Sequence, residues 1–168
     1  TRERKVAICA RAYRLLTERA CFPAEDIILD LNVLALGTGM AEHRDAGAAF
    51  LRGVAWVKAN LPGAKTSGGV SNLSFAFRGH EAIRSALHWV FLREAQAAGL
   101  DMAIVNPATW HPDRPPAEEL QARAKDLVLN LRADALDRLL AYAARTAEAS
   151  DETASGAAHE ITRHILMA

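Results

Sequence analysis

The sequence has little of the charge imbalance and aromatic content that mark several functional classes. Aromatic residues make up 6% of its 168 residues, and 20 basic side chains are balanced by 20 acidic ones. Nucleic-acid-binding proteins and proteins that bind anionic membranes need a basic surface, which this composition does not favour. We therefore expect no nucleic-acid partner and no membrane partner.

Long apolar runs are also missing. No stretch approaches the roughly 20 apolar residues that a membrane span needs. The N-terminal segment TRERKVAICARAYRLL is charged and helical in pattern, whereas a signal peptide has an apolar middle and a small-residue cleavage site. These features predict a cytoplasmic protein.

Cysteine is rare. The two cysteines, Cys9 and Cys21, match neither a disulfide framework nor the spacing of zinc ligands. We predict that both are reduced and buried, as is usual for free cysteines in the cytoplasm.

The chain does contain a regular alternation of helical and strand patterns, and 51% of its residues are hydrophobic. That fraction is enough for one sizeable core. Strands are predicted at residues 26–31, 64–70 and 101–105, the first of them buried on both faces. Apolar residues at helical spacing predict five helices, which run from Val6 to Ala20, Ala46 to Leu61, Ile83 to a cap at Gly99, about Ala117 to Leu131, and Leu136 to Ala143.

This order of elements predicts an α/β fold with a parallel sheet, because helices between strands form right-handed crossover units. A closed eight-stranded barrel typically needs about 250 residues, so three strands make either a small open sheet or a piece of something larger. The residues after Ala147 are small and polar, and we interpret residues 148–168 as a linker or tail of unknown role.

Polar side chains follow each predicted strand. The carboxyl ends of parallel strands share one edge of the sheet, so these side chains should converge there. Carboxylate and amide groups suit a flat, nitrogen-rich heterocycle, although they suit other polar ligands as well. Gly68 and Gly69 would let a ligand approach the backbone closely. The residues concerned are Asp30, Asn32, Ser67, Ser71, Asn72 and Asn106.

Several segments resemble a known family. They are FPAEDIILDLN, GTGMAEH, KTSGGVSNLSFAFRG, REAQAAGLDMAIVNP and DLVLNLR, in this order along most of the chain. Together they resemble the folate-binding domain of cobalamin-dependent methionine synthases, within the pterin-binding barrel superfamily that includes dihydropteroate synthase. The first strand carries D-L-N where that family usually has D-P-N.

The resemblance implies a partial (β/α)8 TIM barrel over residues 1–147, corresponding to strands six to eight. It implies a part of a methyltransferase that is inactive alone and that passes the methyl group of 5-methyltetrahydrofolate to cob(I)alamin, for methionine synthesis. Cobalamin would be bound by another domain of the same enzyme, and zinc would belong to a further domain absent here. The exposed edges of a partial barrel predict a homo-oligomer.

The resemblance also implies roles for individual residues. Asn72 would lie nearest N5 of the folate and act in catalysis, while Asp30 would hold the amino and N–H edge of the pterin. Arg78 would lie beside the ring or the folate tail. The full set expected to bind pterin or folate is Asp30, Asn32, Ser71, Asn72, Arg78 and Asn106.

Simpler interpretations exist for most of these residues. Asp30 and Asn32 could end a strand and cap a helix, and Ser67–Gly69 could be a plain turn with Asn72 at positive φ. We predict that Phe75 and Phe77 pack under the loop. Further predictions are that His43, His80 and His88 are surface or cap residues, and that Trp110 and His111 belong to a loop that could serve as a lid.

Two other functions compete with methyl transfer. The chain could be an inactive partial barrel stabilised by self-association across its exposed edges. It could also be an enzyme like dihydropteroate synthase, although the downstream Lys and Arg-His pair that hold pyrophosphate in that enzyme are not found here.

Overall fold

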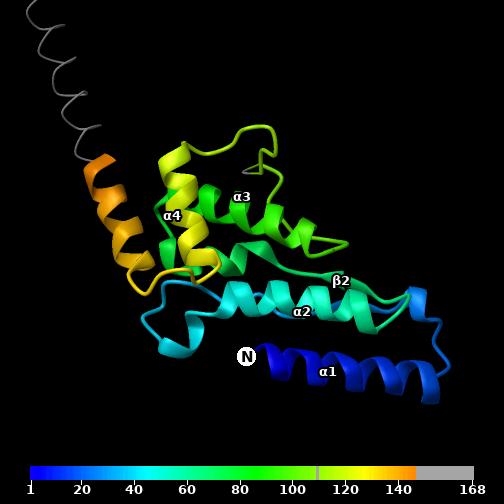
Figure 1. Cartoon of the computed structure of the whole chain (residues 1–168). Helices are drawn as coiled ribbons and strands as arrows, with labels where there is room; N and C mark the ends of the chain where they lie inside the picture. Colours follow the sequence, from blue (N-terminus) through cyan, green and yellow to red (C-terminus); the bar gives the residue numbers. More distant parts are fainter. Residues whose placement is uncertain (109, 147–168) are drawn as a thin grey trace, which may run out of the picture.

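The computed structural model describes residues 1–108 and 110–146, so the predicted linker or tail lies outside the described residues. Every predicted helix is present (Figure 1). The helices are α1 (Arg2–Arg14), α2 (Ala46–Asn60), α3 (Glu81–Ala97) and α4 (Glu118–Val128), followed by a helical segment over residues 135–146. The strands are β1 (Ile28–Asp30) and β2 (Lys65–Ser67).

The ends of the helices follow local chemistry. Thr1 caps α1 through its side-chain oxygen, which accepts a hydrogen bond from the backbone N–H of Arg4 at 3.4 Å. A π-helical turn, Leu15–Arg19, extends α1 before the chain reaches Pro23. At the end of α3, Gly99 adopts a φ of +93°, as expected for a C-terminal cap.

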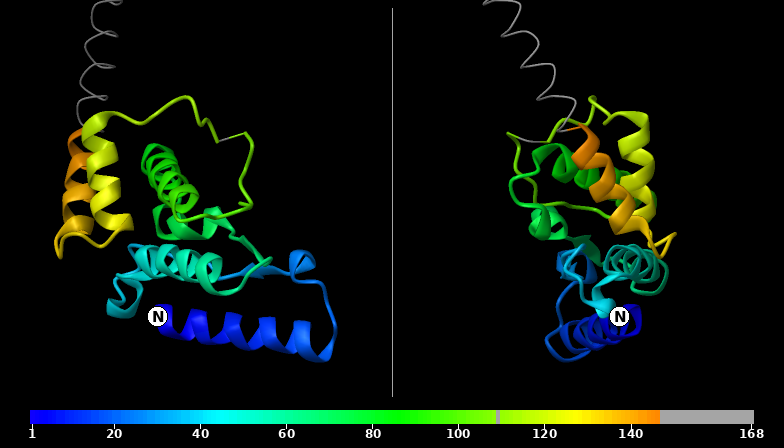
Figure 2. Two further views of the ribbon diagram at one scale, coloured as in Figure 1. Left: turned by 45° about the vertical axis from the view of Figure 1, so that its right-hand side comes forward. Right: turned by 90° about the vertical axis from the view of Figure 1, so that its left-hand side faces the viewer.

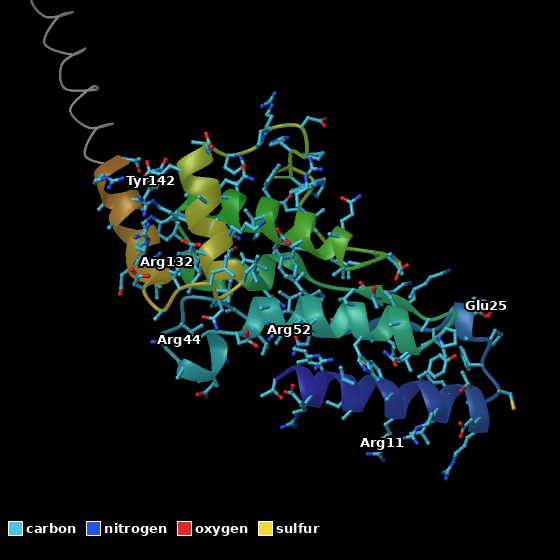
Figure 3. The ribbon with its side chains drawn as sticks, viewed as in Figure 1. Arg11, Glu25, Arg44, Arg52, Arg132 and Tyr142 are labelled. Carbon is cyan, nitrogen blue, oxygen red and sulfur yellow. The ribbon has the colours of Figure 1, made fainter. Side chains whose placement is uncertain are left out.

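Helices α1 and α2 lie side by side, and α2 covers one face of the strands (Figures 1 and 2). A Cβ atom at Gly53 of α2 would lie 2.7 Å from Leu31, so the missing side chain allows this close approach. Arg11 extends from the side of α1 that faces away from α2 (Figure 3). The helical segment 135–146 lies beside α4, and the α3–α4 contact completes the core (Figure 2).

The sheet is smaller than predicted. β1 and β2 pair in parallel, with Ile28 opposite Lys65 and Asp30 opposite Ser67. The prediction of a regular third strand at 101–105 is wrong, because only a short part of that segment pairs, through the parallel bridge of Ile104 with Gly69 and through backbone hydrogen bonds from Met102 to Thr66 and from Ile104 to Gly68. Three parallel strands and a closed barrel are therefore not formed by the described residues.

The reason for the short pairing lies in the side chain of Asp101 and in the turn after β2. The carboxylate of Asp101 accepts the backbone N–H of Thr66 at 2.8 Å, where a longer strand would offer a carbonyl. After Gly69 the chain turns into a 3-10 helix, η4 (Val70–Phe77), so within the segment predicted as 64–70 the strand β2 covers only Lys65–Ser67.

Only one face of the strands is covered. Leu29 is buried, whereas Ile28 is 55% exposed and Ile104 is 67% exposed. The prediction that the first strand is buried on both faces is therefore wrong: alternate side chains point to opposite faces, and the described residues cover only the face toward α2.

One further burial prediction is wrong, and one predicted helix end is misplaced. Cys9 is buried, but Cys21 is exposed at a φ of +53°, because it lies in the turn that follows α1. Leu131 lies beyond the end of α4 and is exposed, since Asn130 turns the chain there with a φ of +53°. No helix among the described residues has the length and apolar character to cross a membrane.

Candidate functional site

The first group of predicted site residues lines a pocket at the carboxyl end of β1, here called the β1-end pocket. It has a volume of about 300 Å³, and Lys5, Asp30 and Asn32 contribute to its lining. The carboxylate of Asp30 accepts the backbone N–H of Asn32 at 2.6 Å, and Asn32 has a φ of +57°. This side-chain hydrogen bond holds the turn although Leu31 stands at the position where D-P-N has a rigid proline. No helix begins at this point, so the two residues do not act as a helix cap.

Lys5 fixes the backbone of this pocket. Its ammonium group donates to the carbonyl oxygen of Leu31 at 2.5 Å and to that of Asn32 at 2.7 Å. Burial lowers the pKa of Lys5, while the nearby Asp30 carboxylate opposes this shift. The sequence interpretation missed Lys5, because a lysine in a charged helix gives no sign of a contact 26 residues away.

The second group lines a pocket of about 310 Å³ against α3, here called the α3 pocket. Ser71 of η4 precedes α3 in the sequence, and Asn106 follows α3 just after the bridged segment; both residues line this pocket. Glu81, Arg84, Ser85 and His88 of α3 complete the lining. The fold therefore brings Ser71 and Asn106 together, and it brings Asp30 and Asn32 together in a separate pocket.

A buried hydrogen-bond network supports the α3 pocket. Ser74 is fully buried, and its hydroxyl lies 2.8 Å from Nε2 of His88 and 3.2 Å from Nε of Arg84. Arg84 also pairs with Glu81 at 2.8 Å. The prediction that His88 is a surface or cap residue is wrong, because η4 packs against α3 and partly covers its ring.

The environment of His88 keeps it neutral. Burial, and then the positive charge of Arg84, lower the pKa of His88 from 6.5 to about 4, although Glu81 acts in the opposite direction. The spacing of Arg84 and His88, four residues apart on one helix, was the sequence signal that could have revealed the pair.

The other predicted residues lie outside these pockets. Asn72 is exposed on η4, and its backbone N–H donates to Gly69 at 3.4 Å. The guanidinium of Arg78 lies 4.0 Å from the ring centre of Phe75. Phe75 is 53% exposed, so the prediction that it packs under the loop is wrong, whereas Phe77 is buried as predicted.

The two glycines at the end of β2 differ. A Cβ atom at Gly68 would lie 2.7 Å from the ring of Phe50, so core packing requires this glycine. A Cβ atom at Gly69 would meet only Asn72, at 3.8 Å. Gly69 is therefore the glycine at which an open backbone is left for a ligand.

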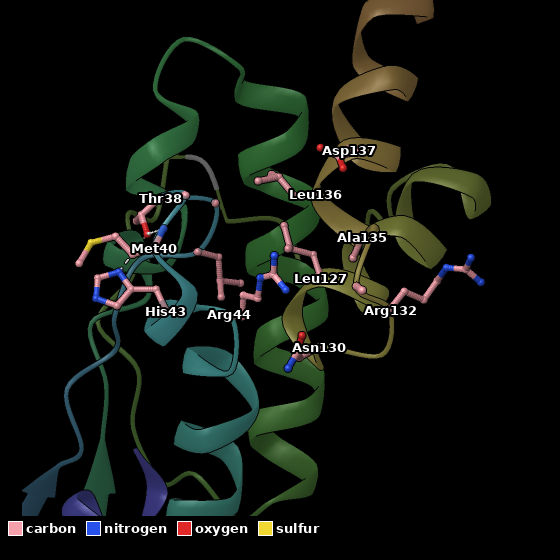
Figure 4. A pocket seen from close by; sticks show the side chains of 14 residues that line it. Thr38, Met40, His43, Arg44, Leu127, Asn130, Arg132, Ala135, Leu136 and Asp137 are labelled. Atoms are coloured by element: carbon pink, nitrogen blue, oxygen red, sulfur yellow. Dashed lines mark hydrogen bonds between the residues drawn. The ribbon is translucent and has the colours of Figure 1, made fainter.

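Two other cavities contain none of the six residues predicted to bind pterin. One, of about 120 Å³, lies between the loop 36–44 and the segment 127–137 (Figure 4). In it Thr38 contacts Nδ1 of His43 at 3.0 Å. The other lies beside Trp89, where Trp110 and His111 line its wall.

Most of the chain matches a known protein family. Residues 1–106 match the family of pterin binding enzymes. The chain belongs to this family. The six residues predicted to bind pterin all fall within the matched range, and the expectation of a pterin-binding enzyme is confirmed at that level. In the described part of this pterin-binding chain, no three His, Cys, Asp or Glu side chains gather in a way that could hold a metal ion.

Proposed function

We propose that this chain is the folate-binding part of a corrinoid-dependent methyltransferase, which transfers the methyl group of 5-methyltetrahydrofolate to cob(I)alamin in methionine synthesis. The supporting observation is the shared α3 pocket of Ser71 and Asn106, two polar residues from separate segments within a pterin-binding family match. Asp30 lies opposite Ser67 in the β1–β2 register, at the same carboxyl edge.

The chemical demand of this reaction lies at N5 of the folate. When the carbon–nitrogen bond breaks, its electron pair stays on N5, which must be protonated or strongly hydrogen-bonded. We assign Asn72 to this position, because its amide can accept a hydrogen bond from a protonated N5. Asn72 is exposed on η4, so a ligand can reach its side chain.

The remaining residues would hold the ring and tail. Asp30, with one oxygen engaged by Asn32, keeps a second oxygen for the pterin amino and N–H edge. Arg78 would offer its guanidinium to the ring or the folate tail. Asn32, Ser71 and Asn106 would supply further hydrogen bonds.

Cobalamin enters this proposal as the methyl acceptor, presented by another domain. The corrinoid-binding motif D-x-H-x-x-G does not occur in the 168 residues. Zinc likewise has no role in the step proposed for this chain, and a cytoplasmic location stays a prediction.

The test compares Asn72→Ala with Asp30→Ala in the complete enzyme, using single-turnover methylation of cob(I)alamin across a titration of 5-methyltetrahydrofolate. Loss of a contact that strengthens in the transition state typically costs on the order of 10²–10³ in rate, so Asn72→Ala should slow transfer at saturating folate. Asp30→Ala should weaken folate binding together with turnover. An unchanged transfer rate in Asn72→Ala would show that Asn72 is not the N5 partner.

A second candidate is structural, in which copies of this chain associate through the open face of the strands. The exposed side chains of Ile28 and Ile104 on that face favour it. Sedimentation analysis would then give a dimer or larger assembly that Ile28→Lys dissociates, whereas a monomer at high concentration contradicts this candidate. A dihydropteroate synthase-like activity would instead require binding of a dihydropterin pyrophosphate.

A further inference from the structure

His88 uses one ring nitrogen inside the protein and leaves the other available. The hydroxyl of Ser74 has one hydrogen to donate. Nε of Arg84 can only donate, so at 3.2 Å it gives its hydrogen to the oxygen of Ser74. Ser74 is fully buried and its hydroxyl has no other acceptor among the described residues, so its hydrogen goes to Nε2 of His88, 2.8 Å away, and Nε2 accepts it.

A neutral imidazole whose Nε2 accepts a hydrogen bond carries its own hydrogen on Nδ1. The lowered pKa of His88, about 4, keeps the ring in this neutral form near pH 7. The Arg84–Ser74 pair therefore selects one tautomer of His88, with Nδ1–H as the remaining donor.

The Nδ1–H of His88 is not enclosed by the protein. Among the described residues Nδ1 has no hydrogen-bond partner. Fully enclosed side-chain nitrogens without a partner occur there only in Arg2 and Arg138, so Nδ1 of His88 is not one of them. Nδ1 is therefore reachable from outside the protein, and His88 itself lines the pocket.

The pocket around it is polar and close to electrically neutral. Arg84 is paired with Glu81, so its charge is locally balanced. Ser71 and Asn106 are uncharged. Such a lining suits an uncharged acceptor atom, for example a ring carbonyl oxygen or an unprotonated ring nitrogen, better than an anionic folate tail.

We propose that His88 is a ligand-binding residue that donates its Nδ1–H to an uncharged acceptor atom of 5-methyltetrahydrofolate, with Ser74 and Arg84 as positioning residues that fix its tautomer. This inference rests on the proposed function, since it takes 5-methyltetrahydrofolate as the ligand of the pocket.

A matched pair of variants separates ligand contact from structural support. In His88→Asn the amide nitrogen lies near the position of Nδ1 and keeps the donor, while the acceptor for Ser74 is lost. In His88→Gln the amide oxygen reaches toward Ser74, while the donor at the Nδ1 position is lost. We expect His88→Gln to raise the Kd for 5-methyltetrahydrofolate about three- to tenfold, and His88→Asn to stay within about twofold of the wild type.

Calorimetric titration of the wild type and the two variants, each made in the complete enzyme, gives these constants at pH 7. Equal affinities, or weaker binding only in His88→Asn, overturn the inference while leaving the proposed function intact. A wild-type protein that binds no reduced folate overturns the proposed function, and this inference with it.

A second measurement does not depend on the variants folding. Nitrogen-15 NMR of the histidine rings in the wild-type protein reports which ring nitrogen is protonated. We expect the Nδ1–H tautomer of His88 at pH 7, with the Nδ1 resonance shifting when 5-methyltetrahydrofolate is added. An Nε2–H tautomer, or a resonance that folate binding leaves unchanged, overturns the inference.

Discussion

The β1-end pocket and the α3 pocket lie beyond the ends of neighbouring parallel segments, yet they are built differently. In the first, Asp30 bonds to the backbone of Asn32, two residues away, and both side chains are exposed. In the second, the fully buried Ser74 bonds to His88 across 14 residues. One pocket is shaped by a local turn that Lys5 of α1 holds, and the other by the packing of η4 against α3.

This difference has energetic consequences. An exposed polar group exchanges its protein partner for water at little cost, whereas a buried group that loses its partner keeps its full desolvation penalty. Changes at the β1-end pocket should therefore act on ligand binding with small effects on folding. Changes at the α3 pocket should act on stability as well.

The largest change in stability is expected for a substitution in the turn that leads into the α3 pocket. We expect Gly68→Ala to destabilise the protein by about 2–3 kcal/mol, because the added Cβ would lie 2.7 Å from the ring of Phe50. Gly69→Ala is the matched control: its φ of −84° suits alanine, and the nearest atom is 3.8 Å away. Urea denaturation measures both, and equal losses would show that the turn does not depend on core packing.

The pH dependence of stability should come partly from the α3 pocket. The pKa of His88 is about 4 in the folded protein against an ordinary value of 6.5, so below pH 6.5 the unfolded chain binds a proton that the folded protein does not. The contribution of His88 to the free energy of unfolding should fall from about pH 6.5 to pH 4 and stay constant below pH 4. After allowance for the partial exposure of His88, the loss is on the order of 1–2 kcal/mol.

Denaturation of the wild type and of His88→Gln at several pH values isolates this contribution from that of the carboxylates. The difference between the two stability curves should change between pH 6.5 and pH 4. If the curves run parallel through this range, burial of His88 does not govern the effect.

The smallest effect is expected at the β1-end pocket. Lys5→Met removes two hydrogen bonds to the carbonyls of Leu31 and Asn32 but keeps an apolar stem of similar length. Because Lys5 is only partly buried, the loss should be about 0.5–1 kcal/mol. Hydrogen exchange should accelerate in the loop after β1 and stay unchanged in η4. Arg11→Met, on the outer side of α1, serves as the control (Figure 3).

Local patterns were enough to predict the helices and the two short strands. Apolar periodicity, Gly99 and Pro23 are visible in the sequence, and their effects are local. The third strand was not predictable as it stands, because its pairing depends on the Asp101 side chain reaching Thr66. The open face of β1 could not be foreseen either, since an apolar run does not reveal how many of its faces are covered.

In the candidate site too, some residues could be identified from local sequence and others could not. Polar residues after strands identified Asp30, Asn32, Ser71 and Asn106, which do line pockets. Lys5 and His88 were not identified from the sequence, because each acts through a contact with a distant segment that folding brings near. Assignments for Asn72 and Arg78 rest on the family resemblance, and their roles stay predictions.

The carboxylate of Asp101 also bears on how the chain folds. It holds the backbone and hydroxyl of Thr66 and the ammonium of Lys58, and the contact with Thr66 closes a loop of 35 residues that contains all of α3. The entropy of closing such a loop must be overcome before its contacts contribute, which makes this step slow relative to helix formation. Ser71 lies inside the closed loop, shortly after Thr66, and Asn106 lies shortly beyond Asp101. The α3 pocket should therefore assemble late on the folding pathway, after α2 and α3 have formed, and Asp101→Asn should slow its appearance in refolding experiments.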